Sequence, residues 1–262
     1  TKREELTMSN PIVAGNWRMN GTISEALRLV SDMKDELHRI PGVRKILFPP
    51  SIALNSVANL VYASSIELGA QNMHHESAGA FTGEISAAMV KESCDWVLLG
   101  HSERRLFFHE SDEEIGLKLA AAVGNQIHPI LCIGENASQR ELGKTQQALR
   151  AQLSIATSDL KSFDNLTIAY EPVWAIGTGK AATIDVVEET FINLRSFMET
   201  EWGAFSQSIP LMYGGSVNGT NATSFASSSL ISGLLVGGAS LIAQDFLSLT
   251  RQFADAKASQ AG

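Results

Sequence analysis

Cysteine is scarce in this sequence of 262 residues, and its usual patterns are absent. There are two cysteines, Cys94 and Cys132, and neither belongs to a CxxC motif. We therefore take a pair of reduced thiols as the default interpretation, which favours a cytoplasmic location. Adjacent His74 and His75 have no carboxylate spacing beside them, so we expect no metal site.

Long apolar runs and a basic charge balance are also missing. No stretch approaches the roughly 18 apolar residues of a membrane span, and runs such as WVLLG and GLLVGG have the length of strands. The net charge of −8 argues against sequence-independent nucleic-acid binding, which needs a basic face. A small anionic substrate stays compatible, because backbone N–H groups can bind one locally.

The N-terminal segment TKREELTMSN has no apolar centre, so it is neither a signal peptide nor an Arg- and Ser-rich transit peptide. We expect residues 1–10 to form a short mobile extension. No linker or change of composition follows, so residues 11–262 are expected to form a single domain.

Strand-like runs recur along the chain and are continuously apolar rather than alternating, as in parallel strands that are buried on both faces. The eight runs are IVAG from Ile12, KILF from Lys45, IELGAQ from Ile66, WVLL from Trp96, PILC from Pro129, LTIAY from Leu166, PLMY from Pro210 and GLLVG from Gly233.

Helical patterns lie between these runs. The segment SEALRLVSDMKDEL has apolar residues at three- and four-residue steps, and Ser111 with Glu114 forms a plausible capping box. Thr183 is the expected cap of TIDVVEETFINLRSFMET. The pattern after Tyr213 is weak.

Repeated alternation of strand and helix predicts an α/β fold, a single (β/α)₈ barrel of eight parallel strands. An open Rossmann sheet is disfavoured, because no GxGxxG opens the first helix.

In such barrels the functional residues lie at the carboxyl ends of the strands. Glu171 ends the sixth run, and Pro172 keeps it out of helical geometry. Gly177 and Gly179 follow as hinge-capable residues, which suggests a lid, although an ordinary loop explains them almost as well. His101 ends the fourth run, where a helix N-terminus would lower the pKa of its imidazole; a structural histidine is the alternative.

Three further strand ends carry candidate residues. Arg18 follows the first run and could pair with an anionic substrate, or with Glu103 as a buried acid; a surface arginine is the alternative. The motifs YGGS and VGGAS follow the seventh and eighth runs, where barrel enzymes often hold phosphate. Either pair of glycines could equally serve a tight turn.

Taken together, these motifs resemble the triosephosphate isomerase family, in order and over nearly the whole chain. The motifs are GNWRMNG, GAFTGEIS, LGHSERR, CIGE, AYEPVWAIGTGK, YGGS and LVGGASL.

The resemblance implies interconversion of dihydroxyacetone phosphate and D-glyceraldehyde 3-phosphate, without cofactor, in glycolysis and gluconeogenesis. It implies that Glu171 moves the carbon-bound proton, that His101 polarises the carbonyl, and that residues 172–180 close as a lid; this family is a standard example of a glutamate base beside a neutral histidine. The remaining expected site residues are Asn16 for the enediolate oxygens, Arg18 and Glu103 as further catalytic residues, and Gly177, Ser216, Gly237 and Gly238 for phosphate.

The long segment after the third run resembles the loop through which family members associate. The resemblance implies a homodimer through residues 72–84, in which Thr82 reaches the partner's site near Asn16. From the sequence alone, a loop of this length would indicate only an insertion of unknown use.

Arg18 departs from the family pattern, which has lysine at this position. A guanidinium is planar and larger than an ammonium, so the two are not interchangeable. We expect an active but slower enzyme, and we expect Arg18→Lys to raise kcat/KM. The alternatives are a phosphate-binding barrel with impaired catalysis because of Arg18, and another sugar-phosphate isomerase or aldolase. The aldolase is disfavoured, because no lysine ends a strand to form a Schiff base.

Overall fold

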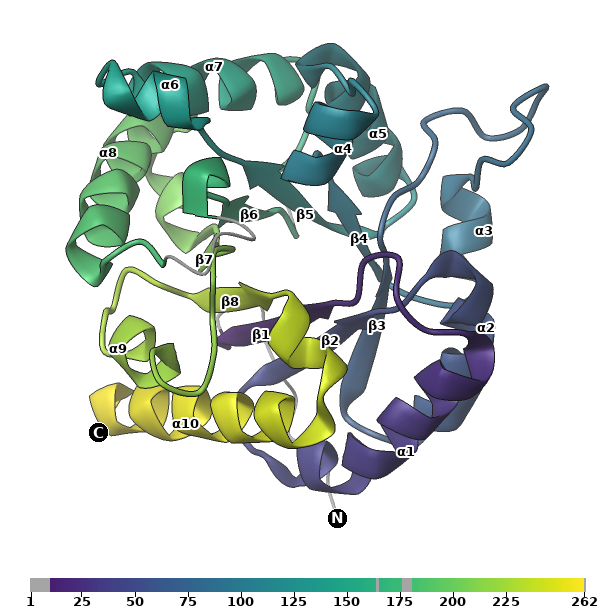
Figure 1. Ribbon diagram of the computed structural model, residues 1–262. Coiled ribbons are helices and arrows are strands. Elements are labelled where there is room, and N and C mark those ends of the chain that lie inside the picture. The colour runs from purple at the N-terminus through teal and green to yellow at the C-terminus, as the bar shows by residue number, and fades with distance from the viewer. Residues whose placement is uncertain (1–9, 164, 176–180, 262) are drawn as a thin grey trace.

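A ring of helices surrounds a closed barrel of parallel strands in the computed structural model of this protein (Figure 1). The structure describes residues 10–163, 165–175 and 181–261. The expected mobile extension over residues 1–10 therefore falls almost wholly outside the described residues and stays a prediction.

The strands pair in chain order, and β8 closes the barrel against β1, with Ile12 opposite Gly233. All pairs are parallel, which confirms the predicted (β/α)₈ barrel. Each predicted run contributes a strand: β1 Ile12–Asn16, β2 Arg44–Phe48, β3 Ile66–Ala70, β4 Trp96–Leu99, β5 His128–Ile133, β6 Thr167–Tyr170, β7 Leu211–Tyr213 and β8 Gly233–Val236.

The helices follow the strands as the sequence predicts. Ser111 and Glu114 form the expected capping box, whereas Thr183 occupies its cap position without a side-chain hydrogen bond to the helix. The weak pattern after Tyr213 gives only a short helix. The α-helices are α1 Ile23–Arg39, α2 Ser51–Val61, α3 Ala87–Lys91, α4 Ser102–Phe107, α5 Asp112–Gly124, α6 Ala137–Glu141, α7 Thr145–Ala156, α8 Ile184–Trp202, α9 Ala222–Ala226 and α10 Ala243–Ala261.

The apolar core has two parts, because successive side chains of a strand point to opposite faces of the sheet. On β1, Ile12 and Ala14 belong to the cluster inside the barrel, while Val13 belongs to the layer between strands and helices. The members of the inner cluster are Ile12, Ala14, Ile46, Phe48, Trp96, Leu98, Ile130, Cys132, Ala169, Met212 and Leu235. The barrel is therefore filled, and a small ligand has to bind at its mouth.

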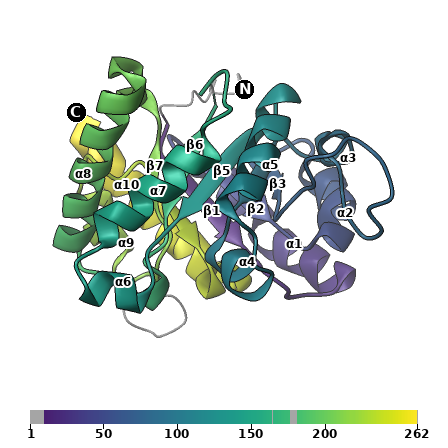
Figure 2. The same ribbon diagram turned by 90° about the horizontal axis from the view of Figure 1, so that it is seen from above.

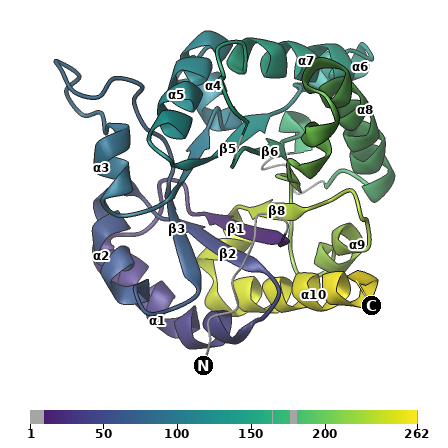
Figure 3. The ribbon, with the colours of Figure 1, turned by 180° about the vertical axis from the view of Figure 1, so that it is seen from behind.

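The connection from β3 to α3 stands out from the ring of helices. It spans residues 71–86 and projects beyond its neighbours in the views from the front, from above and from behind (Figures 1, 2 and 3). A single bridge, between His74 and Ser86, closes the base of this projecting loop. The loop therefore extends from the carboxyl end of β3, the end where the candidate site residues lie.

Candidate active site

Glu171 is the first residue after β6, and its side chain is almost completely buried, at 2% exposure. One carboxylate oxygen, Oε2, accepts a hydrogen bond from the backbone N–H of Ser102 at 2.9 Å. The other, Oε1, lies 3.0 Å from Nε2 of His101. The structure thus brings the two residues predicted to carry the chemistry into direct contact at the mouth of the barrel.

Two glycines enclose Glu171: Gly134, which was given no role from the sequence, and Gly214, which belongs to the YGGS motif expected near phosphate. A Cβ atom on Gly134 would lie 1.7 Å from the backbone oxygen of Glu171, and one on Gly214 would lie 2.9 Å from its Cγ. Such distances exclude any side chain at Gly134 without displacement of the backbone that carries the carboxylate. The signal in the sequence was the CIGE motif, in which Gly134 follows β5 directly.

His101 caps the N-terminus of α4, and its two ring nitrogens have different partners. The backbone N–H of Glu103 donates to Nδ1 at 3.2 Å, so the ring proton of the neutral form lies on Nε2 and faces Glu171. Burial lowers the pKa of His101, but the carboxylates of Glu171 and Glu103 raise it by more, and the net pKa lies above its ordinary value. The expected net lowering is therefore wrong for the arrangement in which Glu171 touches the ring.

The same contact sets the ionisation of Glu171. Burial raises the pKa of Glu171, but His101 and the Ser102 N–H stabilise the carboxylate, and the net pKa lies below its ordinary value. Behind it, burial and the nearby Glu171 raise the pKa of Cys132 well above its ordinary value, so this buried thiol stays protonated. An ionised carboxylate, ready to accept a proton, therefore stands at the end of β6.

Asn16 ends β1 and is buried, at 5% exposure. Its Oδ1 atom accepts a hydrogen bond from the backbone N–H of Arg18 at 3.0 Å. Because the carbonyl side of the amide is occupied in this way, the Nδ2 group is the one that can donate to a ligand oxygen. Asn16 and His101 line the same hollow, of about 440 Å³, which Glu171 does not line.

Arg18 has a left-handed backbone, with φ +53°, and its side chain reaches across the mouth of the barrel. Its Nε lies 2.5 Å from Oε1 of Glu103, as the sequence suggested, although Glu103 is partly exposed rather than buried. Its Nη1 lies 2.3 Å from the position that a Cβ on Gly237 would take. The absence of a side chain at Gly237 therefore makes room for the guanidinium beside the loop that follows β8.

The loops after β6, β7 and β8 meet at this mouth. The hydroxyl of Ser216 donates to the carbonyl of Ala175 at 3.0 Å, and the backbone N–H of Ala182 donates to the hydroxyl of Tyr213 at 3.1 Å. Gly238 begins a short 3-10 helix, Gly238–Leu241. Both flanks of the expected lid are thus tied to β7 and its loop, while residues 176–180, with Gly177, lie outside the described residues.

Exposed apolar side chains surround the 440 Å³ hollow. Met19 is 97% exposed, Phe108 65% and Met89 57%, and all three line it together with Asn16 and His101. The projecting loop begins beside it, since Gln71 and Gly83 also line the hollow. Thr82 itself is exposed on that loop.

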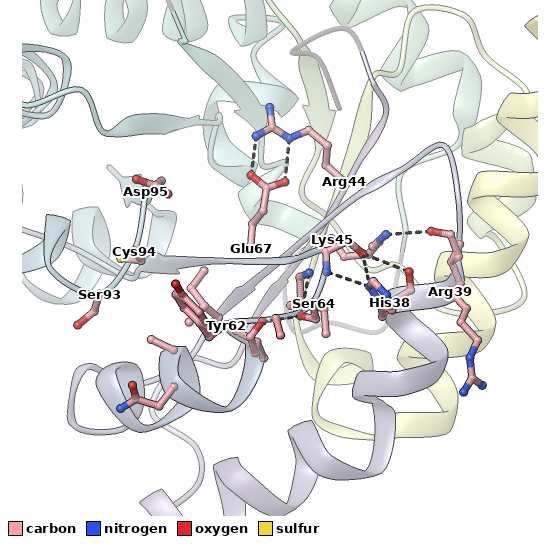
Figure 4. A pocket seen from close by; sticks show the side chains of 18 of the residues that line it. His38, Arg39, Arg44, Lys45, Tyr62, Ser64, Glu67, Ser93, Cys94 and Asp95 are labelled. Carbon is pink, nitrogen blue, oxygen red and sulfur yellow. Dashed lines mark hydrogen bonds and ion pairs between the residues drawn. The ribbon is translucent and has the colours of Figure 1, made fainter. Parts of the chain in front are cut away.

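A larger hollow, of about 1230 Å³, contains none of the predicted site residues. Within it, the guanidinium of Arg44 faces the carboxylate of Glu67, and the side chain of Asp95 lies nearby (Figure 4). Arg44 and Glu67 neutralise each other, and this hollow lies apart from Glu171 and His101. Among the described residues, His, Cys, Asp and Glu side chains do not gather in threes as a metal site would require. The helices of the same residues lack the length and apolar character of a membrane span.

Comparison with known proteins gives a consistent result. A family model described as triosephosphate isomerase matches residues 11–253. The curated triosephosphate isomerase of Dehalococcoides mccartyi (strain BAV1) is 47% identical over 248 residues, which cover 94% of this chain and 98% of that protein. The triosephosphate isomerase of Alkaliphilus oremlandii is 43% identical over 246 residues, covering 92% and 99%.

A solved structure has the same fold. The crystal structure of triosephosphate isomerase from Bartonella henselae superposes with a TM-score of 0.85 at 35% sequence identity. The match covers 93% of this chain and 99% of that one. The similarity therefore extends over the complete barrel and over each of the strand ends described above.

Proposed function

The chain belongs to the triosephosphate isomerase family and is an isomerase. We propose that it interconverts dihydroxyacetone phosphate and D-glyceraldehyde 3-phosphate, with Glu171 and His101 as the reacting groups. The observation that carries the proposal is the 3.0 Å contact between Nε2 of His101 and Oε1 of Glu171 at the mouth of the barrel. A base and a hydrogen-bond donor therefore lie close enough together to contact the same substrate.

The chemistry follows from these two groups. Glu171 removes a proton from the carbon beside the carbonyl group and returns it to the neighbouring carbon. The Nε2–H of His101 donates to the carbonyl oxygen and stabilises the charge that develops there. A substrate placed between the two separates the ring from the carboxylate, which removes the main cause that raises the pKa of His101. Burial then keeps the imidazole uncharged.

Asn16 and Arg18 complete the oxyanion environment. Oδ1 of Asn16 is occupied by the Arg18 N–H, so its Nδ2 group donates to an enediolate oxygen. Arg18, with Glu103 on its Nε, offers its terminal guanidinium nitrogens beside Gly237. The phosphate is held by this cation and by backbone N–H groups of Gly177, Ser216, Gly237 and Gly238. The alternative of impaired catalysis through Arg18 has no observation in its favour.

Residues 172–180 form the lid over this site. The hydrogen bonds from Ser216 to Ala175 and from Ala182 to Tyr213 support this role, because they anchor the two flanks to β7 and its loop. A closed lid excludes water, in which the enediolate would otherwise lose its phosphate.

The active form is a homodimer that assembles through residues 72–84, with Thr82 beside the partner's Asn16. The exposed Met19, Met89 and Phe108 around the 440 Å³ hollow support this arrangement, because a partner's loop would cover them. Sedimentation equilibrium checks it, and a monomer that is fully active at assay concentration would refute it.

We place the enzyme in the cytoplasm, in keeping with the unpaired thiols of Cys94 and Cys132.

Glu171→Gln tests the proposal, because it removes the base while it preserves the shape of the side chain. In a coupled assay with glyceraldehyde 3-phosphate, we expect kcat/KM to fall by about 10²- to 10⁴-fold. Thermal unfolding of the same sample shows whether the barrel is intact. A folded variant that keeps wild-type turnover would exclude Glu171 as the base.

A further inference from the structure

Gln71 lies just beyond β3 and has no part in the chemistry described above. Its side-chain amide donates to two backbone carbonyls, that of Arg18 at 2.9 Å and that of Phe48 at 2.8 Å. Both partners are acceptors, which fixes the orientation of the amide, since only its NH₂ group can satisfy them. One side chain thus ties the segment after β1 to the last residue of β2.

The carbonyl that Gln71 holds belongs to a residue with a strained backbone. Arg18 has φ +53°, a left-handed conformation that is unfavourable for a long non-glycine side chain. Two neighbouring side chains secure it from opposite ends, since Oδ1 of Asn16 accepts from the Arg18 N–H and Nε2 of Gln71 donates to the Arg18 carbonyl. Without the second contact, the residue could relax toward an ordinary conformation.

The backbone conformation of Arg18 decides where its guanidinium lies. In the strained form, Nε lies 2.5 Å from Oε1 of Glu103, and Nη1 lies against the backbone of Gly237. A relaxed backbone would redirect the Cα–Cβ bond and move the cation away from the loop after β8. A displacement of about 1 Å from the productive position can cost on the order of 100-fold in rate.

We propose that Gln71 is a positioning residue for the isomerase reaction, which holds the left-handed backbone of Arg18 and so keeps the guanidinium at the phosphate end of the substrate. The inference rests on the proposed function, which places the phosphate beside Gly237. It gives Gln71 an effect on catalysis that acts through Arg18.

Gln71→Met is the direct test, because it keeps the length of the side chain and removes both donors. We expect kcat/KM to fall by about 10- to 100-fold, and the inhibition constant of inorganic phosphate to rise in parallel. Gln260→Met is the matched control, since Gln260 also donates through Nε2 to a backbone carbonyl, that of Ala226, at 2.7 Å between α10 and α9. This control should leave both constants unchanged.

A double-mutant cycle separates positioning from simple stabilisation. Glycine adopts the left-handed conformation without strain, so Arg18→Gly removes both the strain and the guanidinium. In that background we expect Gln71→Met to change kcat/KM by no more than about twofold. A further loss as large as that in the wild type would show that Gln71 acts independently of Arg18 and would overturn the proposal.

The failure of this inference is distinguishable from that of the proposed function. If wild-type protein turns over glyceraldehyde 3-phosphate but Gln71→Met keeps its kcat/KM and its phosphate inhibition, the positioning role alone is wrong. If the wild type itself has no turnover, the proposed function is wrong. Gln71→Asn serves if Gln71→Met does not fold: it retains an amide that is one methylene too short to reach both carbonyls, and the same loss is expected.

Discussion

The two ends of the barrel hold their charged groups in opposite ways. At the amino end, Arg44 makes a two-pronged ion pair with Glu67, and Trp96 donates a further hydrogen bond to the same carboxylate. The guanidinium also lies over the Trp96 ring, 4.7 Å from its centroid, and His128 stacks on that ring at 4.9 Å. Arg44 and Glu67 thus neutralise each other.

At the carboxyl end, Arg18 forms an ion pair with Glu103, but Glu171 is held differently. Glu171 has the N–H of Ser102 and the imidazole of His101 as partners, and a substrate can replace the imidazole. Removing one partner of a fully paired buried charge destabilises the fold, whereas buried charge with a replaceable partner can react. The difference predicts that substitutions at the carboxyl end change turnover and that those at the amino end change unfolding.

Among the substitutions that test this difference, Gly134→Ala should lower turnover the most. The new methyl group would lie 1.7 Å from the backbone oxygen of Glu171, so the base must move, and we expect kcat/KM to fall by at least about 100-fold. Gly124→Ala is the control, because a Cβ there meets nothing within 4 Å. Steady-state kinetics on both variants checks this, and equal activities would contradict it.

Arg18→Lys should give the next largest change in kcat/KM, and this change should be an increase. A compact ammonium leaves more room beside Gly237 than the guanidinium does, so the substrate can lie closer to its productive position, and we expect kcat/KM to rise by about 10-fold. The coupled assay measures it. A fall instead would mean that Glu103 and Gly237 have adapted to arginine.

Glu67→Gln should leave turnover unchanged and lower stability. It removes the charge of the carboxylate that pairs with the largely buried Arg44, which we expect to cost about 1–3 kcal/mol in the free energy of unfolding by urea. Glu36→Gln is the control, since Glu36 forms an exposed pair with Arg251 at 3.2 Å, which should contribute less than about 1 kcal/mol. Equal losses of unfolding free energy in the two variants would contradict the claim that the ion pair at the barrel end contributes more to stability than the exposed pair.

Substitution of His128 should change stability the least, and only at acidic pH. Burial and, after it, the nearby Arg44 lower the pKa of His128; Asp95 and Glu67 oppose them by less, and Lys91 adds a still smaller lowering. The folded state therefore resists protonation, while the unfolded chain binds a proton near the ordinary pKa. The stability that neutral His128 contributes is complete above that pKa and is lost as the pH falls through the lower folded value. His128→Gln should flatten this part of the stability curve, and an unchanged curve would refute the assignment.

Most of the fold could be predicted from the sequence, because the strand runs and the intervening helical patterns are local signals. The same holds for Glu171 and His101, which end strands and so must lie at one mouth. The contact of Gly134 with Glu171 and the bond from Gln71 to Arg18 were missed, because both depend on distances between strands that are remote in sequence. The pKa of His101 was wrongly expected to fall, because its contact with Glu171 is a tertiary one.

The central claim is that His101 acts as an uncharged imidazole opposite the carboxylate of Glu171. Nitrogen-15 NMR of the ring in a complex with a phosphate-bearing inhibitor measures this most directly. We predict, at neutral pH, a proton on Nε2 and none on Nδ1, where the Glu103 N–H donates. A ring that carries protons on both nitrogens in that complex would contradict the mechanism.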